Sequence, residues 1–251
     1  MSGEGDFLPF EGEWGRARER RFRETIVFVH HFGGSKRTVL RHVKMANDLG
    51  FDTVRFPLMF NKVLPAQQLP ITADLKFGAR HVWAGQIESV LNSIPGKKIV
   101  YSFSMPSNGA LEAIAKRRAK DVSAWVSDGG PFLQVLKCSW NLFEHQWRVQ
   151  SKLLRGLFTG FSYFIFGHGL DQESPKFIAM LPDGFHVLSI RGGKDPLVPQ
   201  GAIEDVFKTA DKIALERLVI PDGVHLDGLK NHEAEYLPVV SRFLKAHATP
   251  V

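Results

Sequence analysis

The chain has 251 residues, of which 44% are hydrophobic and 23% charged, a composition that excludes a disordered chain and predicts a single domain over residues 1–251. Its lone cysteine, Cys138, excludes an internal disulfide, and no apolar run reaches the roughly 20 residues that a membrane span requires. The net charge of +6 comes partly from basic clusters at 16–23 and 116–118. No aromatic and basic motif accompanies them, so we interpret them as solvated faces rather than as a surface for nucleic acid or an anionic membrane.

The first half of the chain alternates between strand and helix patterns. Nearly continuous runs of β-branched and aromatic residues predict buried strands at 24–29 and 51–58. Between them lie a glycine-rich turn at 30–34 and a helix that Ser35 can cap and Gly50 can close. The other elements predicted in this half are a short edge strand within 18–23 and a mostly helical segment at 71–94.

The second half continues the alternation. Strands are predicted at 99–101, 121–126, 185–191 and 215–220, with a closing helix at 233–246. Strands that alternate with helices at this spacing form a parallel sheet with helices on both faces. The predicted fold class is therefore α/β, with a doubly wound and mainly parallel sheet.

The segment 132–181 breaks the alternation, because it is rich in aromatic residues and carries no strand pattern. The spacing of Leu153, Leu154, Leu157 and Phe158 indicates amphipathic helices. We predict a helical lid inserted between late strands, over the sheet edge where open α/β folds place their sites. The alternative is a small satellite core that packs on itself.

Residues 97–115 predict a short strand, a sharp corner and a helix, a layout that exposes a nucleophilic serine above a sheet. The G-x-S-x-G pattern of such corners is degenerate here, with Ser102 and Pro106 in place of the glycines. Pro106 suits the first helical position, which puts Ser104 at the corner and leaves the N–H of Met105 to donate to an oxyanion. In the alternative interpretation Ser104 only caps the helix.

Two further polar residues follow predicted strands. Asp195 lies in the stretch GKDPLVP and His225 in the stretch GVHLD. Acyl transfer by a serine needs a base for its proton and an acid that orients this base. Because all three positions follow the carboxyl ends of strands, we expect Ser104, Asp195 and His225 to meet at one edge of the sheet. Asp128, at the end of another strand, is an alternative acid.

The order of serine, aspartate and histidine, together with the stretches around Asp195 and His225, resembles the α/β-hydrolase superfamily. The resemblance covers the chain from about residue 24 to about residue 246. It implies the α/β-hydrolase fold, with Ser104 as the nucleophile, Asp195 as the orienting acid and His225 as the base.

The sequence HHFGG at 30–34 resembles the H-G-F-G-G loop of the same superfamily. This likeness implies an oxyanion hole made by the backbone N–H groups of Phe32 and Met105. His31 stands where the family has glycine. His30, at the end of the strand, is expected to shape the loop rather than to transfer protons.

Together these patterns predict a serine hydrolase of the carboxylesterase or lipase type, acting on a hydrophobic ester through an acyl-enzyme intermediate. The aromatic lid favours an apolar substrate, and the predicted substrate contacts are His31, Trp140, Trp147 and Phe158. One alternative is a ligand-binding or weakly active protein on the same fold. Another is an acyltransferase or a C–C bond-cleaving enzyme, because the same three residues serve those reactions.

Neither a metal nor a cofactor is expected, because the His, Cys and Asp residues lack metal-ligand spacing and the glycine pairs do not form a dinucleotide-binding motif. The expected partner is a small hydrophobic ester, with no nucleic acid and no stable membrane insertion, and the oligomeric state is left open. The acidic, glycine-rich first residues lack the apolar segment of a signal peptide, which together with the single cysteine predicts a cytoplasmic location.

Overall fold

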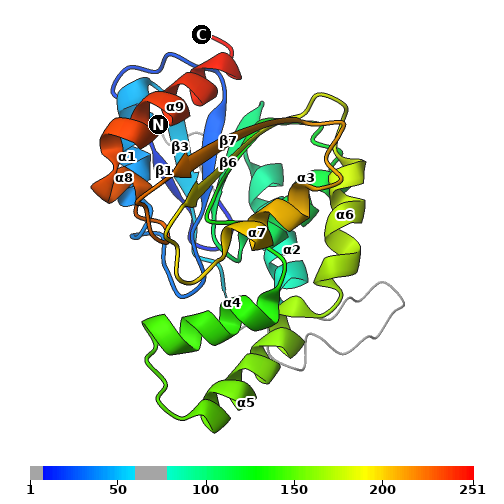
Figure 1. Ribbon diagram of the computed structural model, residues 1–251. Coiled ribbons are helices and arrows are strands. Elements are labelled where there is room, and N and C mark those ends of the chain that lie inside the picture. Colours follow the sequence, from blue (N-terminus) through cyan, green and yellow to red (C-terminus); the bar gives the residue numbers. More distant parts are fainter. Residues whose placement is uncertain (1–7, 60–77) are drawn as a thin grey trace.

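The computed structural model of the protein describes residues 8–59 and 78–251. Within these residues, seven strands form one sheet in the order β1-β3-β2-β4-β5-β6-β7 (Figure 1). The strands are β1 (Glu13–Gly15), β2 (Thr25–Val29), β3 (Asp52–Arg55), β4 (Lys98–Phe103), β5 (Val122–Asp128), β6 (His186–Gly192) and β7 (Ala214–Ile220). The edge strand β1 runs antiparallel to β3, and the other neighbouring pairs are parallel. The predicted doubly wound, mainly parallel sheet is therefore confirmed.

Helices cover both faces of the sheet (Figure 1). One face carries α1 (Leu40–Leu49), α8 (Gly228–Asn231) and α9 (Glu233–Ala246). The other carries α2 (Ala79–Ser93), α3 (Ser107–Lys116), α6 (Leu170–Met180), α7 (Gln200–Glu204) and the 3₁₀ turn η5 (Asp205–Phe207). Each face of the sheet has its own hydrophobic core, and successive strand residues contribute to the two cores in turn. Val27 and Val100 pack toward α2 and α3, whereas Ile26 and Ile99 pack toward α1 and α9. Such strands are buried on both faces, which explains their continuous apolar runs.

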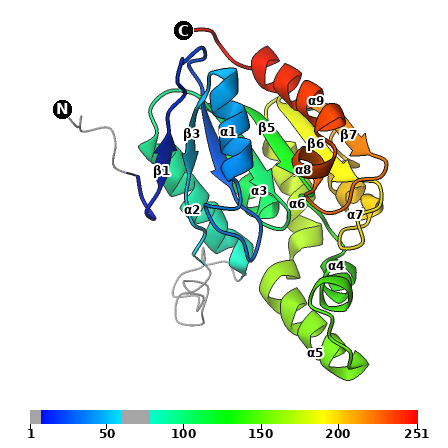
Figure 2. The ribbon, with the colours of Figure 1, turned by 90° about the vertical axis from the view of Figure 1, so that its left-hand side faces the viewer.

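The segment between β5 and β6 is helical and extends beyond the layers (Figures 1 and 2). It comprises α4 (Val135–Asn141), the π turn η3 (Leu142–Gln146), α5 (Lys152–Ser162), the π turn η4 (Tyr163–Gly167) and α6. These helices fall within the stretch where the lid is predicted, and their role as a lid stays a prediction. Among the described helices, none is both long enough and apolar enough to cross a membrane.

The predicted edge strand within 18–23 is wrong, because the antiparallel edge strand lies earlier, at Glu13–Gly15. The main chain of 18–23 is held by a side chain instead. The guanidinium of Arg20 donates to the carbonyl oxygens of Phe22 and Arg23, at 3.0 and 2.7 Å. The carbonyls of Phe22 and Arg23 are therefore satisfied by a side chain, and an isolated bridge joins Phe22 to Pro250.

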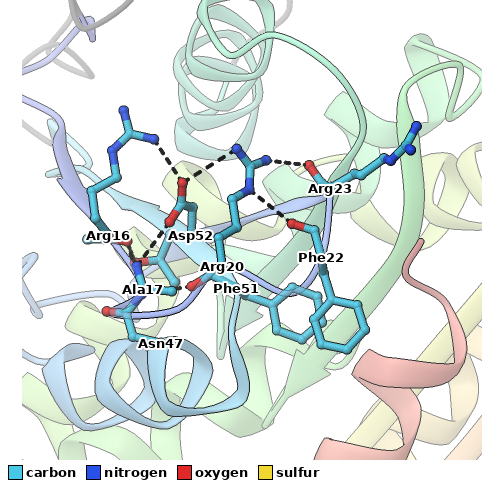
Figure 3. Close-up of polar contacts among 10 residues, drawn as sticks. Arg16, Ala17, Arg20, Phe22, Arg23, Asn47, Phe51 and Asp52 are labelled. Carbon is cyan, nitrogen blue, oxygen red and sulfur yellow. Dashed lines mark hydrogen bonds and ion pairs between the residues drawn. The ribbon is translucent and has the colours of Figure 1, made fainter. Parts of the chain in front are cut away.

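The same basic cluster surrounds a buried carboxylate at the start of β3 (Figure 3). Asp52 accepts hydrogen bonds from the Arg16 guanidinium at 2.9 Å and from the Ala17 N–H at 3.0 Å, and Arg20 forms an ion pair with it at 3.7 Å. These cations neutralise a carboxylate that is only 4% exposed. Part of the positive charge near the N-terminus therefore anchors the chain to the sheet.

The start of one helix also differs from the sequence prediction. Helix α1 begins at Leu40 rather than after Ser35, because the Ser35 hydroxyl accepts from the Arg37 N–H inside a preceding turn. Gly50 ends this helix in a left-handed conformation at φ 99°, as predicted. The predicted helix at 71–94 is described only from α2 onward, and its first residues lie outside the described part of the chain.

Candidate active site

Ser104 lies at the corner between β4 and α3, in a backbone conformation that serine rarely adopts. Its φ is 55°, in the left-handed region, where an L-residue is strained. The Ser104 N–H donates to the carbonyl of Asp128 on the neighbouring strand at 2.8 Å, which fixes the corner to the sheet. Helix α3 starts three residues later, at Ser107, with Pro106 as its N-cap at φ −60°. Proline is therefore compatible with this corner. It occupies the N-cap, whereas the sequence predicted it at the first helical position.

Two neighbouring residues explain how the corner forms without the usual glycines. A Cβ on Gly130 would lie 2.4 Å from the Ser104 carbonyl oxygen, so the close approach depends on a glycine of the adjacent loop. Ser102, in place of the first glycine, points into the sheet, and its hydroxyl accepts from the Trp125 indole N–H at 2.8 Å. The buried hydroxyl is thus satisfied where it lies.

A chain of hydrogen bonds joins the three residues predicted to form the catalytic group. The Ser104 Oγ lies 2.9 Å from His225 Nε2, and His225 Nδ1 lies 2.6 Å from Asp195 Oδ2. Because an ionised carboxylate only accepts hydrogen bonds, Nδ1 carries the proton and Nε2 is the acceptor for the serine hydroxyl. This tautomer is the one a general base requires.

The Asp195 side chain is held rigidly by burial and by two backbone N–H groups. Its side chain is 2% exposed, and its second oxygen accepts from the N–H groups of Leu197 and Val198 at 2.8 and 3.0 Å. The turn that follows Asp195 thus fixes the carboxylate plane that faces His225. These two amides could not be recognised in the sequence, because backbone donors leave no residue signature.

The loops that carry Asp195 and His225 are tied to each other. The Gly193 N–H donates to Ile220 O at 2.7 Å, and the Lys194 N–H donates to Gly223 O at 2.9 Å. A Cβ on Gly193 would lie 2.5 Å from the Pro221 carbonyl oxygen, so this approach requires glycine. The pairing of β6 with β7 therefore determines the distance between the acid and the base.

Asp128, the alternative acid, belongs to a separate buried network. It accepts from the Tyr236 hydroxyl at 2.7 Å, and Tyr236 in turn makes a short hydrogen bond with Tyr101. Burial raises the pKa of Asp128 to about 6, although its hydrogen bond with Tyr236 and the nearby His225 oppose the rise. The structure thus brings Asp195, and not Asp128, into hydrogen-bond contact with His225. Nothing in the sequence around Tyr236 indicated this network.

The raised pKa of Asp128 predicts a pH dependence of stability. An unfolded chain loses this proton near pH 4 and the folded protein near pH 6, so the folded state binds more protons between these values. The free energy of unfolding should therefore fall as the pH rises through this window and stay lower above it. Relative to Asp128→Asn, the wild type should lose up to about 3 kcal/mol between pH 4 and pH 7.

Urea unfolding of both proteins at a series of pH values measures this difference, in which the titration of other groups cancels. The Tyr236→Phe variant serves as a control, because it removes the hydroxyl but keeps the buried carboxyl. It should retain the fall in stability with rising pH. A difference between wild type and Asp128→Asn that is constant with pH would contradict the raised pKa.

The loop after β2 is shaped by its two histidines. His30 Nε2 accepts from the Leu58 N–H at 2.9 Å, so its Nδ1 carries the proton and donates to His31 O at 2.8 Å. His31 Nδ1 donates to Phe32 O at 2.9 Å. Burial lowers the pKa of both imidazoles, and the nearby His225 lowers that of His31 further. Both are neutral at pH 7 and orient main-chain groups.

A cavity of about 910 Å³ opens above Ser104. His31, Phe32 and Met105 line it beside the serine, and the Met105 N–H makes no backbone hydrogen bond within the described part of the chain. Most of the remaining lining is apolar and comes from the segment between β5 and β6, including Val135, Leu142, Phe143, Trp147, Phe158, Phe161, Ile165 and Phe166. The predicted contacts His31, Trp147 and Phe158 therefore face this space.

Trp140, the fourth predicted contact, is not among the residues that line this cavity. Its ring instead packs under the Arg155 guanidinium, 4.9 Å from the ring centroid, and so joins α4 to α5. Helical spacing alone could not show which side of α4 faces the serine. Cys138 does line the cavity, but burial raises the pKa of its thiol to about 12, so Cys138 stays a thiol at neutral pH. Within residues 8–59 and 78–251, no group of three His, Cys, Asp or Glu side chains could hold a metal ion.

The sheet order, the corner at Ser104 and the placement of Asp195 and His225 after successive strands define the α/β-hydrolase fold. The chain superimposes on an esterase from Pyrococcus furiosus with a TM-score of 0.66 at 14% identity, over 94% of this chain and 85% of that one. A hydrolase from Oleispira antarctica gives 0.61 at 14% identity, over 93% and 94% of the two chains. Mouse alpha/beta hydrolase domain-containing protein 10 gives 0.57 at 14% identity, over 94% and 93%.

Comparisons of the sequence itself give no such relatives. No protein-family model matches the chain. No curated protein matches it either. The likeness therefore rests on three-dimensional structure, and at 14% identity it shows the fold alone.

Proposed function

We propose that the protein is a serine hydrolase that cleaves an ester with a hydrophobic acyl or aryl group. The observation that carries this proposal is the unbroken hydrogen-bond chain from Ser104 through His225 to Asp195, at the floor of an apolar cavity. Names of similar structures agree with it, since they include an esterase from Pyrococcus furiosus and the protein Est1E from Butyrivibrio proteoclasticus. Ester cleavage is the chemistry that such a chain performs most directly.

In the proposed mechanism, the Ser104 oxygen attacks the ester carbonyl while His225 Nε2 takes the hydroxyl proton. Asp195 stabilises the resulting imidazolium, and His225 then returns the proton to the departing alcohol. This leaves an acyl group on Ser104. Water, activated by His225 in the same way, releases the acid and restores the serine.

The negative oxygen that develops in each step needs two donors. The backbone N–H groups of Phe32 and Met105 are the proposed donors, because both residues line the cavity beside Ser104. The Phe32 ring packs edge-on against Phe166 at 5.1 Å, and this contact supports the position of the loop. His31, in place of a glycine, keeps the carbonyl of Phe32 turned toward its own imidazole.

The segment between β5 and β6 is the proposed lid. Its aromatic and aliphatic side chains form most of the cavity wall, and an apolar substrate group would be buried against them at a gain of roughly 25 cal/mol per Å². This wall favours a hydrophobic acyl or aryl group over a charged one. It offers no aspartate or glutamate to bind a cationic substrate.

Labelling with a fluorophosphonate probe tests the proposal. The probe should add to one serine, and peptide mass spectrometry should place the adduct on Ser104, because only that hydroxyl is polarised by His225. Ser104→Ala should abolish both labelling and hydrolysis of nitrophenyl esters. Ser107→Ala is the matched control, since its buried hydroxyl has no hydrogen-bond partner in the described structure and should be dispensable for labelling.

A folded wild-type protein that takes up no probe would contradict the proposal. Tight binding of a small apolar ligand without turnover would instead support a ligand-binding protein on this fold. Products trapped by added alcohols, in preference to water, would identify an acyltransferase.

A further inference from the structure

Helix α5 presents its apolar side chains to solvent and its polar side chains to the protein. Its three buried residues are Arg155, Thr159 and Ser162, exposed by 8%, 7% and 8%. Three of its outward residues are Leu153, Leu157 and Phe161, exposed by 75%, 61% and 65%. A surface helix normally has the reverse arrangement. We call the outward surface, formed by Leu153, Leu154, Leu157, Phe158 and Phe161, the α5 apolar face.

The inward polar side of α5 is well satisfied, so the orientation of the helix has a structural basis. The Arg155 guanidinium makes a short ion pair with Glu144 and donates to the Val149 carbonyl at 3.0 Å. It also lies over the Trp140 ring. The Ser151 hydroxyl caps the helix by accepting from the Leu154 N–H. Rotating the helix to bury its leucines would break these contacts of Arg155.

The α5 apolar face lies at the outer end of the molecule. In both views α5 is at the end farthest from the C-terminus and projects beyond the sheet and its helices (Figures 1 and 2). Phe158 and Phe161 belong to this face and also line the cavity above Ser104. The α5 apolar face is therefore continuous with the cavity wall. Such continuity is expected if the face and the cavity mouth contact the same apolar environment.

The sequence segment that carries this face is basic. Residues 145–170 contain no aspartate or glutamate, whereas they contain Arg148, Lys152 and Arg155. Arg155 is neutralised by Glu144, which leaves Arg148 and Lys152 exposed at the N-terminal end of α5. An apolar helix face flanked by exposed cations is the pattern of helices that lie in the interface of an anionic bilayer.

We propose that the α5 apolar face docks this protein on the surface of an anionic lipid bilayer, with the helix lying in the interface plane and the cavity opening toward the lipid. A second copy of the chain is a less suitable occupant. A two-fold pairing through this face would place the Arg148 and Lys152 side chains of both copies around one apolar contact without acidic partners from 145–170. Anionic headgroups supply the missing negative charge. This docking goes beyond the proposed hydrolysis and does not depend on it.

Vesicle flotation with the full chain tests the docking. Vesicles of phosphatidylcholine with phosphatidylglycerol should carry the wild type to the top of the gradient, whereas pure phosphatidylcholine vesicles should carry much less. Leu153→Ser combined with Leu157→Ser should weaken partitioning at least about tenfold, because two exposed leucines lose their apolar contact with the lipid. Neither leucine lines the cavity, so hydrolysis of a soluble ester should be unchanged.

Two further variants separate the apolar and electrostatic contributions. Leu40→Ser combined with Val251→Ser also removes two exposed apolar side chains, but far from α5, and should float like the wild type. Lys152→Glu should weaken binding to anionic vesicles about tenfold without harming the helix, because a carboxylate suits its first turn. Ser104→Ala should float like the wild type, so a failure of the proposed hydrolysis would not affect this result.

Three results would overturn the docking proposal. The wild type would stay at the bottom of the gradient with anionic vesicles, or the double leucine variant would float as well as the wild type. In the third, light scattering would show a dimer that the double leucine variant converts to a monomer, and this would assign the face to a second copy.

Discussion

Asp195→Asn is expected to lower kcat for ester hydrolysis by about 10⁴-fold while the protein stays folded. Because the N–H groups of Leu197 and Val198 can pair only with the side-chain oxygen, the NH₂ group of the amide would face His225 Nδ1 and donate to it. His225 would then spend much of its time with Nε2 protonated, where it cannot accept the Ser104 proton. The remaining contacts of the side-chain oxygen with Leu197 and Val198 should preserve the loop.

Steady-state kinetics with a soluble nitrophenyl ester measures this effect, and Asp128→Asn is its matched control. Asp128 is a second buried aspartate near the imidazole, but its carboxylate contacts Tyr236 rather than His225. Its replacement should change kcat by less than about tenfold, the size of an indirect electrostatic effect. If Asp128→Asn were the more damaging substitution, the assignment of the acid would be reversed.

Glu173→Gln is expected to lower the free energy of unfolding by about 3 kcal/mol. Glu173 forms a short ion pair with Arg80, whose side chain is only 2% exposed. Burial lowers the pKa of Arg80 from its usual value, but the guanidinium stays charged, so removing its main partner leaves a buried cation poorly compensated. Arg80 Nε and Nη1 already have no hydrogen-bond partner in the described part of the chain.

Thermal and urea unfolding measure the loss, and an exposed ion pair provides the control. Glu216 pairs with Arg242, whose side chain is 62% exposed, so Glu216→Gln should cost less than about 1 kcal/mol. Because Glu173 is on α6 and Arg80 on α2, the buried pair joins the segment between β5 and β6 to the main body. Equal losses for the two variants would show that the buried pair has no special role.

The order of strands and helices could be predicted from the sequence because it depends on local patterns. Continuous apolar runs mark strands that are buried on both faces, as Ile26 to Val29 are. The closing helix at 233–246 was predicted with the bounds that the structure shows. Boundaries set by side chains distant in the sequence were missed, since the pairing of Arg20 and Asp52 depends on the folded sheet.

The three residues of the candidate site were also predicted, because each follows a strand and carries a side chain suited to acyl transfer. Their contact distances could not be predicted. They depend on close backbone approaches at Gly130 and Gly193 and on the amides that bind Asp195. The packing of Trp140 against Arg155 could not be predicted either, because sequence spacing places Trp140 on a helix without showing which way that helix faces.

The amino-acid sequence by itself determined the α/β class, the positions of the strands and the residue types that follow them, since these depend on periodicity and on neighbours along the chain. Only the tertiary structure decided that Asp195 rather than Asp128 contacts His225, and that α5 turns its leucines outward. Both outcomes are set by contacts between residues far apart in the sequence. His225 pairs with Asp195 across two loops, and Arg155 on α5 pairs with Glu144. Each pairing fixes which way the side chain, and the element that carries it, faces.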